Sequence, residues 1–220
     1  VTVEVANGCP FLVNVTIVEP PILDAIVSIT DVTCNGQCDG ILTVTATGGT
    51  GAIEYSLDGI TFQTGNVFTS LCAGPFTVTV RDANGCTFVV NPTINEPLAR
   101  TLTTTVVYFT CNGACDANVT LTASGGTLPL EYSLDGITYV AGNLFSNLCA
   151  GAQTAFVRDG NGCLLSVNFT PTEPAALVIS LVNVTNATCG LPNGVIEVAA
   201  TGGTPALTYS SDGITFVASP

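Results

Sequence analysis

Residues 34–86 read CNGQCDGILTVTATGGTGAIEYSLDGITFQTGNVFTSLCAGPFTVTVRDANGC, and the recurrence of this stretch decides the fold. Three short motifs return along the chain at one constant step of 77 residues. They are Gly-Gly-Thr at Gly48, Gly125 and Gly202, Asn-Gly-Cys at Asn7, Asn84 and Asn161, and Glu-Pro at Glu19, Glu96 and Glu173. Independent motifs that share one period indicate a tandem array of a single structural unit.

The Glu-Pro pairs give the expected domain boundaries. Residues 1–20 are predicted to be the C-terminal part of one repeat, 21–97 and 98–174 to be whole repeats, and 175–220 to be the N-terminal part of another. The sequence starts and stops inside a repeat and contains no Met. We therefore expect this chain to be a portion of a longer polypeptide.

Each repeat is predicted to be all-β, because short alternating runs are separated by Gly, Asn, Asp and Pro turns. In the first whole repeat the expected strands are 25–30, 41–47, 53–56, 60–62, 67–71, 76–80 and 87–94. The turns that define the repeat are Gly48-Gly49 and Asp58-Gly59, with Gly125-Gly126 and Asp135-Gly136 in the second copy. Seven short strands with this spacing predict an immunoglobulin-like or fibronectin-like sandwich. The short Glu-Pro connectors predict a stiff rod of abutting repeats.

The charge of the chain excludes several classes of partner. Three residues are cationic, sixteen are acidic, and the net charge is −13. Such a surface repels phosphate backbones and anionic lipid, so we expect no nucleic acid or membrane surface as a partner. With no His and no Lys, a Ser or Cys nucleophile lacks its ordinary base, and the acidic side chains recur with the repeat. We expect no enzyme activity.

Ten cysteines without any His indicate disulfides formed in an oxidising compartment rather than a zinc site. Antiparallel strands alternate in direction, which places the turns carrying Cys38 and Cys72 at the same end of the sandwich. The sequence therefore predicts a Cys38–Cys72 bond and its copy, Cys115–Cys149.

Two pairings remain open for Cys34. It lies at the C-terminal end of its repeat, and Cys163 lies at the N-terminal end of the next, so Cys34–Cys163 is one hypothesis. A six-residue strand spans about 20 Å, which argues against the alternative bond between Cys34 and Cys86 of the same repeat. Under the first hypothesis Cys9, Cys86, Cys111 and Cys189 pair with repeats outside this sequence.

The repeat resembles the SprB repeat of very long surface adhesins of Bacteroidetes, including the adhesin used for gliding motility. The resemblance rests on Asp39-Gly40, Gly48-Gly49-Thr50, Tyr55-Ser56, Leu71, Ala73-Gly74, 77–80 and 82–86. It implies export by the type IX secretion system and display as an outer-membrane-attached, extracellular filament. The implied partners are the secretion and motility machinery of the outer membrane, neighbouring repeats, and external surfaces or polysaccharide bound by other regions. This sequence departs from the family in having Leu57 and Leu134 after Tyr-Ser, where Trp is usual, and in its second cysteine pair.

No cofactor is expected. Calcium is the one candidate metal, because Asp31, Asp39, Asp58 and Asp82 lie in turns, yet no dense acidic loop offers the six to eight oxygen ligands that calcium requires. These aspartates also have a structural explanation as residues that cap their own backbone.

The sequence thus predicts a mechanical role, in which a disulfide-stapled stalk holds a binding tip away from the cell and transmits force. Two alternatives remain. In one, the repeats bind glycans or surfaces themselves through avidity. In the other, they pack laterally into a filament or sheath.

Overall fold

The computed structural model describes residues 1–4 and 6–218 and divides the chain into two compact units, Val1–Pro97 and Leu98–Pro220. The division falls at the predicted boundary between the two whole repeats. Every regular element in the described part is a β-strand, in small antiparallel sheets, so the all-β prediction of tandem β-sandwich repeats is confirmed. Within those residues, no helix has the length and hydropathy needed to cross a bilayer.

The first repeat, residues 21–97, is a sandwich of two three-stranded sheets joined by a small two-stranded one. One sheet has the order β3-β4-β6, the second has the order β5-β8-β9, and β7 pairs with β10. The strands are β3 (Asp24–Thr30), β4 (Gly40–Thr47), β5 (Glu54–Ser56), β6 (Val67–Leu71), β7 (Gly74–Pro75), β8 (Val78–Arg81), β9 (Thr87–Val90) and β10 (Thr93–Ile94).

The core of the first repeat lies between its two main sheets. Leu42 and Val44 of β4 and Val78 and Val80 of β8 are fully buried, and Tyr55 of β5 packs with them. Thr43 and Thr45 alternate with the core residues of β4, and Thr77 and Thr79 with those of β8, which places threonines on the opposite face of each strand. This two-residue alternation is what sequence analysis used to identify the strands.

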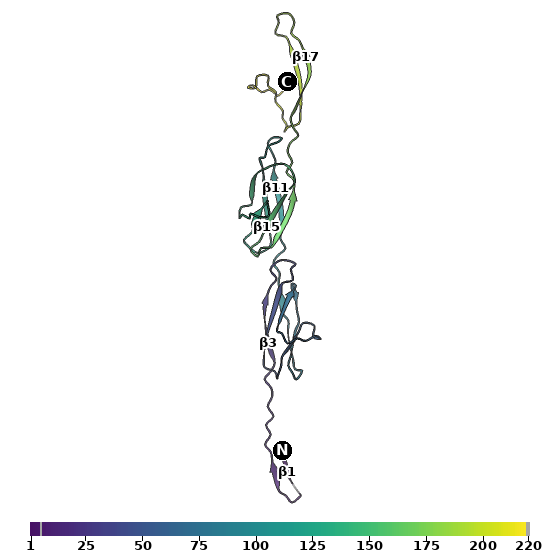
Figure 1. The fold of residues 1–220 in the computed structure, drawn as a ribbon, viewed down its shortest axis with the longest axis vertical. Helices are drawn as coiled ribbons and strands as arrows, with labels where there is room; N and C mark the ends of the chain where they lie inside the picture. The colour runs from purple at the N-terminus through teal and green to yellow at the C-terminus, as the bar shows by residue number, and fades with distance from the viewer. Residues whose placement is uncertain (5, 219–220) are drawn as a thin grey trace. The chain divides into compact units, whose positions relative to one another are not determined.

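The second repeat, residues 98–174, repeats this arrangement, and Figure 1 labels two of its strands, β11 and β15. Its sheets have the orders β11-β12-β14 and β13-β15-β16, around a core that includes Val119, Leu121 and Val157. The strands are β11 (Thr101–Val107), β12 (Ala117–Ser124), β13 (Glu131–Ser133), β14 (Leu144–Leu148), β15 (Gln153–Arg158) and β16 (Leu164–Phe169).

The flanking segments form hairpins. β1 (Thr2–Glu4) pairs with β2 (Pro10–Leu12), and β17 (Val178–Thr185) pairs with β18 (Val195–Thr201). Ile196 of β18 occupies the repeat position of the buried Val119, yet it is 68% exposed.

The predicted strand at Ile60–Phe62 is wrong. The chain does reverse here, since Tyr55 and Gln63 exchange two backbone hydrogen bonds, but residues 57–62 form a loop. The amide groups of Ile60 and Thr61 donate to the carboxylate of Asp58 instead of to a neighbouring strand. The strand predicted at 76–80 begins only at Val78, and the single strand predicted at 87–94 is interrupted between Val90 and Thr93.

Candidate functional site

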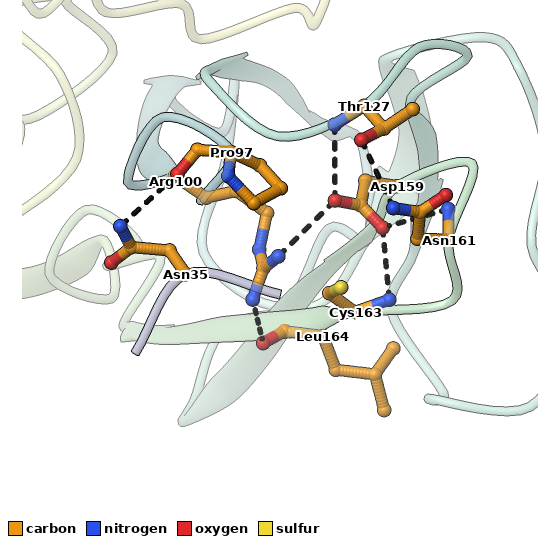
Figure 2. A network of polar contacts seen from close by, with 8 residues as sticks. All are labelled: Asn35, Pro97, Arg100, Thr127, Asp159, Asn161, Cys163 and Leu164. Carbon is orange, nitrogen blue, oxygen red and sulfur yellow. Dashed lines mark hydrogen bonds and ion pairs between the residues drawn. The ribbon is translucent and has the colours of Figure 1, made fainter. Parts of the chain in front are cut away.

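The C-terminal exit of each repeat is held by the turn that follows its first strand. In the first repeat, the amide nitrogen of Gly36 donates to Glu96 Oε2 at 2.8 Å, and Asn35 Nδ2 donates to the carbonyl oxygen of Pro97 at 3.1 Å. The second of these bonds is drawn in Figure 2. The same two bonds recur in the second repeat, where Gly113 and Asn112 contact Glu173 and Pro174 at 2.7 and 3.0 Å. Sequence analysis identified Glu-Pro only as a boundary and missed this exit clamp.

The N-terminal entry of each repeat is held by the Gly-Gly-Thr turn. Gly49 N donates to the carbonyl oxygen of Pro21 at 2.9 Å, and Gly126 N donates to that of Leu98 at 2.9 Å. The preceding glycine allows this approach. A Cβ atom on Gly48 would lie 1.9 Å from the carbonyl oxygen of Ile22, and the φ angle of +74° already favours glycine. We call this contact the entry clamp.

The predicted turn at Asp58-Gly59 is a loop organised around one carboxylate. Asp58 Oδ1 accepts from Ile60 N, Thr61 N and Ser56 Oγ at 2.7–2.8 Å. The amide of Ile60 contributes most to holding the pKa of Asp58 far below its ordinary value, followed by the Ser56 hydroxyl and the amide of Thr61. Asp135 makes the same bonds in the second repeat.

A second aspartate turn lies before the Asn-Gly-Cys motif of each whole repeat. Burial acts to raise the pKa of Asp82, but backbone amides of Thr50, Cys86 and Asn84 donate to its carboxylate and together bring that pKa below its ordinary value. The bond from Thr50 ties this turn to the Gly-Gly-Thr turn of the entry clamp. Asp159 has the equivalent bonds from Thr127, Cys163 and Asn161.

In the second repeat, Asp159 also binds a cation, as Figure 2 shows. Arg100 Nη1 lies 3.2 Å from Asp159 Oδ2, and Arg100 Nη2 donates to the carbonyl oxygen of Leu164 at 3.2 Å. The side chain of Asp159 has no exposed surface, and that of Arg100 is 13% exposed. Sequence analysis did not single out this pair, whose members are 59 positions apart. The signal was that Arg100 is one of only three cations in the chain.

The cysteines fall into distinct groups. Cys38 is bonded to Cys72 and Cys115 to Cys149, the pairing that the strand directions predict. Cys9, Cys86, Cys111 and Cys189 are exposed free thiols. Because Cys86 is a free thiol, the alternative bond between Cys34 and Cys86 is not formed. The pairing of Cys34 with Cys163 stays a prediction.

The four aspartates considered for calcium each bind donors of their own repeat. Asp31 Oδ1 accepts from Asn95 N at 2.7 Å, and Asp39 accepts from the amide and hydroxyl of Thr33. Asp58 and Asp82 are occupied as described above. Among residues 1–4 and 6–218, no three acidic, Cys or His side chains converge as a metal site. Turn capping accounts for these aspartates without a metal.

Comparison with known protein families gives a match for two segments of the chain. Residues 26–62 and 181–215 match the family model described as SprB repeat, so the resemblance is confirmed for these two segments. Both matches run from the first long strand of a repeat to its Asp-Gly loop. SprB repeats are associated with cell-surface, adhesin-like proteins. No curated protein matches the chain.

Proposed function

We propose that this chain, in which residues 26–62 and 181–215 are SprB repeats, is a stalk segment of a long adhesin of the gliding-motility type. The stalk is exported by type IX secretion, remains attached to the outer membrane, and holds a binding tip away from the cell. Its work is mechanical, because tension applied at the tip reaches the cell only through successive repeats.

The observation that carries this proposal is the pair of clamps in each whole repeat. The entry clamp ties Pro21 to Gly49, and the exit clamp ties Glu96 and Pro97 to Gly36 and Asn35. Tension therefore enters and leaves a repeat at residues bonded to its own turns. A repeat held at both ends resists peeling from its termini, where folded domains ordinarily begin to open.

The two terminal segments of the first repeat are also joined to each other. Val32 N donates to Asn95 O at 3.2 Å, and Asn95 N donates to Asp31 Oδ1 at 2.7 Å. Both segments run toward the exit clamp, since β3 leads into Asn35 and β10 leads into Pro97. Tension on the two termini therefore shears these bonds together instead of breaking them one after another.

The bond between Cys38 and Cys72 limits how far a repeat can lengthen. It closes a loop with a sequence separation of 34 residues, and the second repeat has the same separation. At 3.3–3.6 Å per residue, each closed loop withholds about 120 Å of chain from extension. In single-molecule pulling, reduction of the disulfides should lengthen each unfolding step by about this amount. Steps of equal length before and after reduction would contradict the mechanical role of the bond.

The cellular role is tested with antibody raised against the repeats and attached to beads on live, producing cells. We expect the antibody to label intact cells and the beads to be carried along the surface. Failure to label intact cells would overturn surface display. Beads that bind and stay in place would overturn coupling to a motor and leave a passive stalk.

A further inference from the structure

The exit clamp of each whole repeat is built on an Asn-Gly dipeptide, which is Asn35-Gly36 in the first repeat and Asn112-Gly113 in the second. Both dipeptides are exposed to solvent. Asparagine loses ammonia most readily before glycine, because glycine has no side chain to hinder attack of its own amide nitrogen on the asparagine side chain. The two residues that hold the exit of a repeat are therefore also a chemically reactive pair.

Both reacting groups are engaged while the clamp is closed. The Gly36 amide, whose nitrogen would attack, donates a hydrogen bond to Glu96 Oε2 at 2.8 Å. The Asn35 side-chain amide, which would be attacked, donates from Nδ2 to the carbonyl oxygen of Pro97 at 3.1 Å (Figure 2). A carboxylate is too weak a base to take an amide proton, so the bond to Glu96 holds the nitrogen in its unreactive form. The equivalent groups of the second repeat are engaged in the same way.

We propose that Asn35 and Asn112 are deamidation sites that react only when the exit clamp opens. In the open clamp the deprotonated Gly36 nitrogen attacks Cγ of Asn35, the new carbon–nitrogen bond closes a succinimide ring, and Nδ2 leaves as ammonia. One water molecule then opens the ring to aspartate or isoaspartate. Water is consumed and ammonia is released in equal amounts, with no change in oxidation state.

The product cannot form the clamp again. An aspartate at position 35 has no Nδ2 to donate to the carbonyl oxygen of Pro97, and it brings a second negative charge to the turn that Glu96 contacts. Isoaspartate also lengthens the main chain ahead of Gly36, which displaces the amide that binds Glu96. Opening of the clamp is reversible until deamidation makes it permanent. This inference goes beyond the proposed function, because it depends on the exit clamp and not on gliding or surface display.

The first experiment compares the folded and unfolded protein. The 220-residue chain is incubated in mildly alkaline buffer with and without denaturant, reduced, digested after its arginines and sequenced by mass spectrometry, which locates each converted asparagine. We expect Asn35 and Asn112 to convert at least about tenfold more slowly in the folded chain, because they become reactive only by local opening. Equal rates with and without denaturant would overturn the proposal.

Substitution of one glutamate tests whether the clamp is the cause. Glu96→Ala removes the acceptor of the Gly36 amide and should raise the rate at Asn35 about tenfold, since a hydrogen bond to a charged acceptor contributes roughly that factor to the opening equilibrium. Asn112 in the same molecule is the internal control, because its own clamp is intact, and its rate should not change. Glu19→Ala removes the same charge from another Glu-Pro pair and should leave both rates unchanged. An unchanged rate at Asn35 in Glu96→Ala, or an equal rise at both asparagines, would contradict gating by the clamp.

The product state is tested with Asn35→Asp, followed by hydrogen exchange and mass spectrometry. We expect the Gly36 amide to exchange faster than in the unsubstituted chain, while the amides of the buried strand β4 stay protected and show that the variant has folded. Slow exchange at Gly36 in this variant would refute permanent opening. The comparison of folded and unfolded chains uses no substitution, so it decides the proposal even where a variant fails to fold. None of these rates bears on surface display.

Discussion

The first and second repeats have the same turns but different strands. In the second repeat β15 and β16 are continuous and pair over six positions, from Gln153–Phe169 to Arg158–Leu164. The matching stretch of the first repeat, 76–81 with 87–92, pairs over only four positions, from Val78–Val90 to Arg81–Thr87, and β7 and β10 form a separate short pair beyond it. Pro92 stands where the second repeat has Phe169, the partner of Gln153 at the end of the ladder, and proline has no amide to donate there. The turns specify the repeat, and strand continuity is free to vary.

The repeats also differ in how they treat one buried aspartate. Asp82 and Asp159 each accept three backbone amides, but only Asp159 has a cation, because Leu23 occupies the position of Arg100 in the first repeat. Leu23 instead joins the apolar core. The Nε atom of Arg100 is buried without a hydrogen-bond partner among the described residues, which is a cost of this substitution. Three backbone amides are therefore enough to hold the buried carboxylate in the first repeat, and Arg100 adds one further contact to it in the second.

The largest effect should come from the element that both repeats share. Gly48→Ala and Gly125→Ala place a Cβ atom 1.9 and 2.1 Å from a carbonyl oxygen at a positive φ angle. We expect each to destabilise its own repeat by about 4 kcal/mol or more. Hydrogen exchange followed by mass spectrometry measures the loss in each repeat separately.

Gly36→Ala is the matched control. Gly36 also has a positive φ angle, but its Cβ would meet no atom within 4 Å, so only backbone strain of about 1 kcal/mol remains. If Gly48→Ala were no more harmful than Gly36→Ala, the turn would not be the common specification of the two repeats.

A smaller loss of stability is expected from substitutions at the buried Arg100–Asp159 pair, which the second repeat has and the first lacks. Asp159→Asn leaves Arg100 buried without its carboxylate, so we expect a loss of about 3 kcal/mol in the second repeat. Arg100→Leu reproduces the first repeat and should change stability by less than about 1 kcal/mol, because the three amides still bind Asp159. Denaturant unfolding of the two variants measures both values. A loss from Arg100→Leu as large as that from Asp159→Asn would refute the view that the arginine is an addition.

The repeats are expected to differ least in how their stability falls at low pH, because each has the same aspartate loop. The folded pKa of Asp212 is lowered from 3.8 to about 2 by the amides of Thr215 and Ile214, and the pKa values of Asp58 and Asp135 are lowered by the same kind of loop. Because the folded pKa values are depressed, this stabilisation is present above the unfolded pKa of 3.8 and is lost as pH falls through the folded pKa, which for Asp212 is about 2.

Melting temperatures between pH 7 and pH 2 test this loop. Both repeats should lose stability over the same window, and Asp58→Asn should flatten the acid dependence of the first repeat alone. An unchanged melting temperature at pH 2.5, or an Asp58→Asn variant with the full acid dependence, would contradict a stabilising role for the charged loop.

Local chemistry made much of this fold predictable. The turns at Gly48 and Asp58 and the burial of Leu42 and Val44 follow from residues within a few positions of each other. The pairing of Cys38 with Cys72 followed from counting strand reversals. The break between β9 and β10 was readable from Pro92, and the prediction of a single strand at 87–94 overlooked it.

Contacts between distant residues were not predictable. The strand expected at Ile60–Phe62 failed because the carboxylate of Asp58 competes with a neighbouring strand for the same amides, and sequence spacing does not decide that competition. The exit clamp joins Gly36 to Glu96 over 60 positions, and the buried pair joins Arg100 to Asp159 over 59. Only the folded chain brings these groups together.

The self-contained clamps have a consequence for how such a protein changes in length. Glu96 and Pro97 are bonded to Asn35 and Gly36 of their own repeat, and Glu173 and Pro174 to Asn112 and Gly113 of theirs. Insertion or deletion of one 77-residue copy therefore leaves none of these end groups without its acceptor or donor. A change in the number of copies can therefore alter the length of the protein while the fold of each repeat stays as it is.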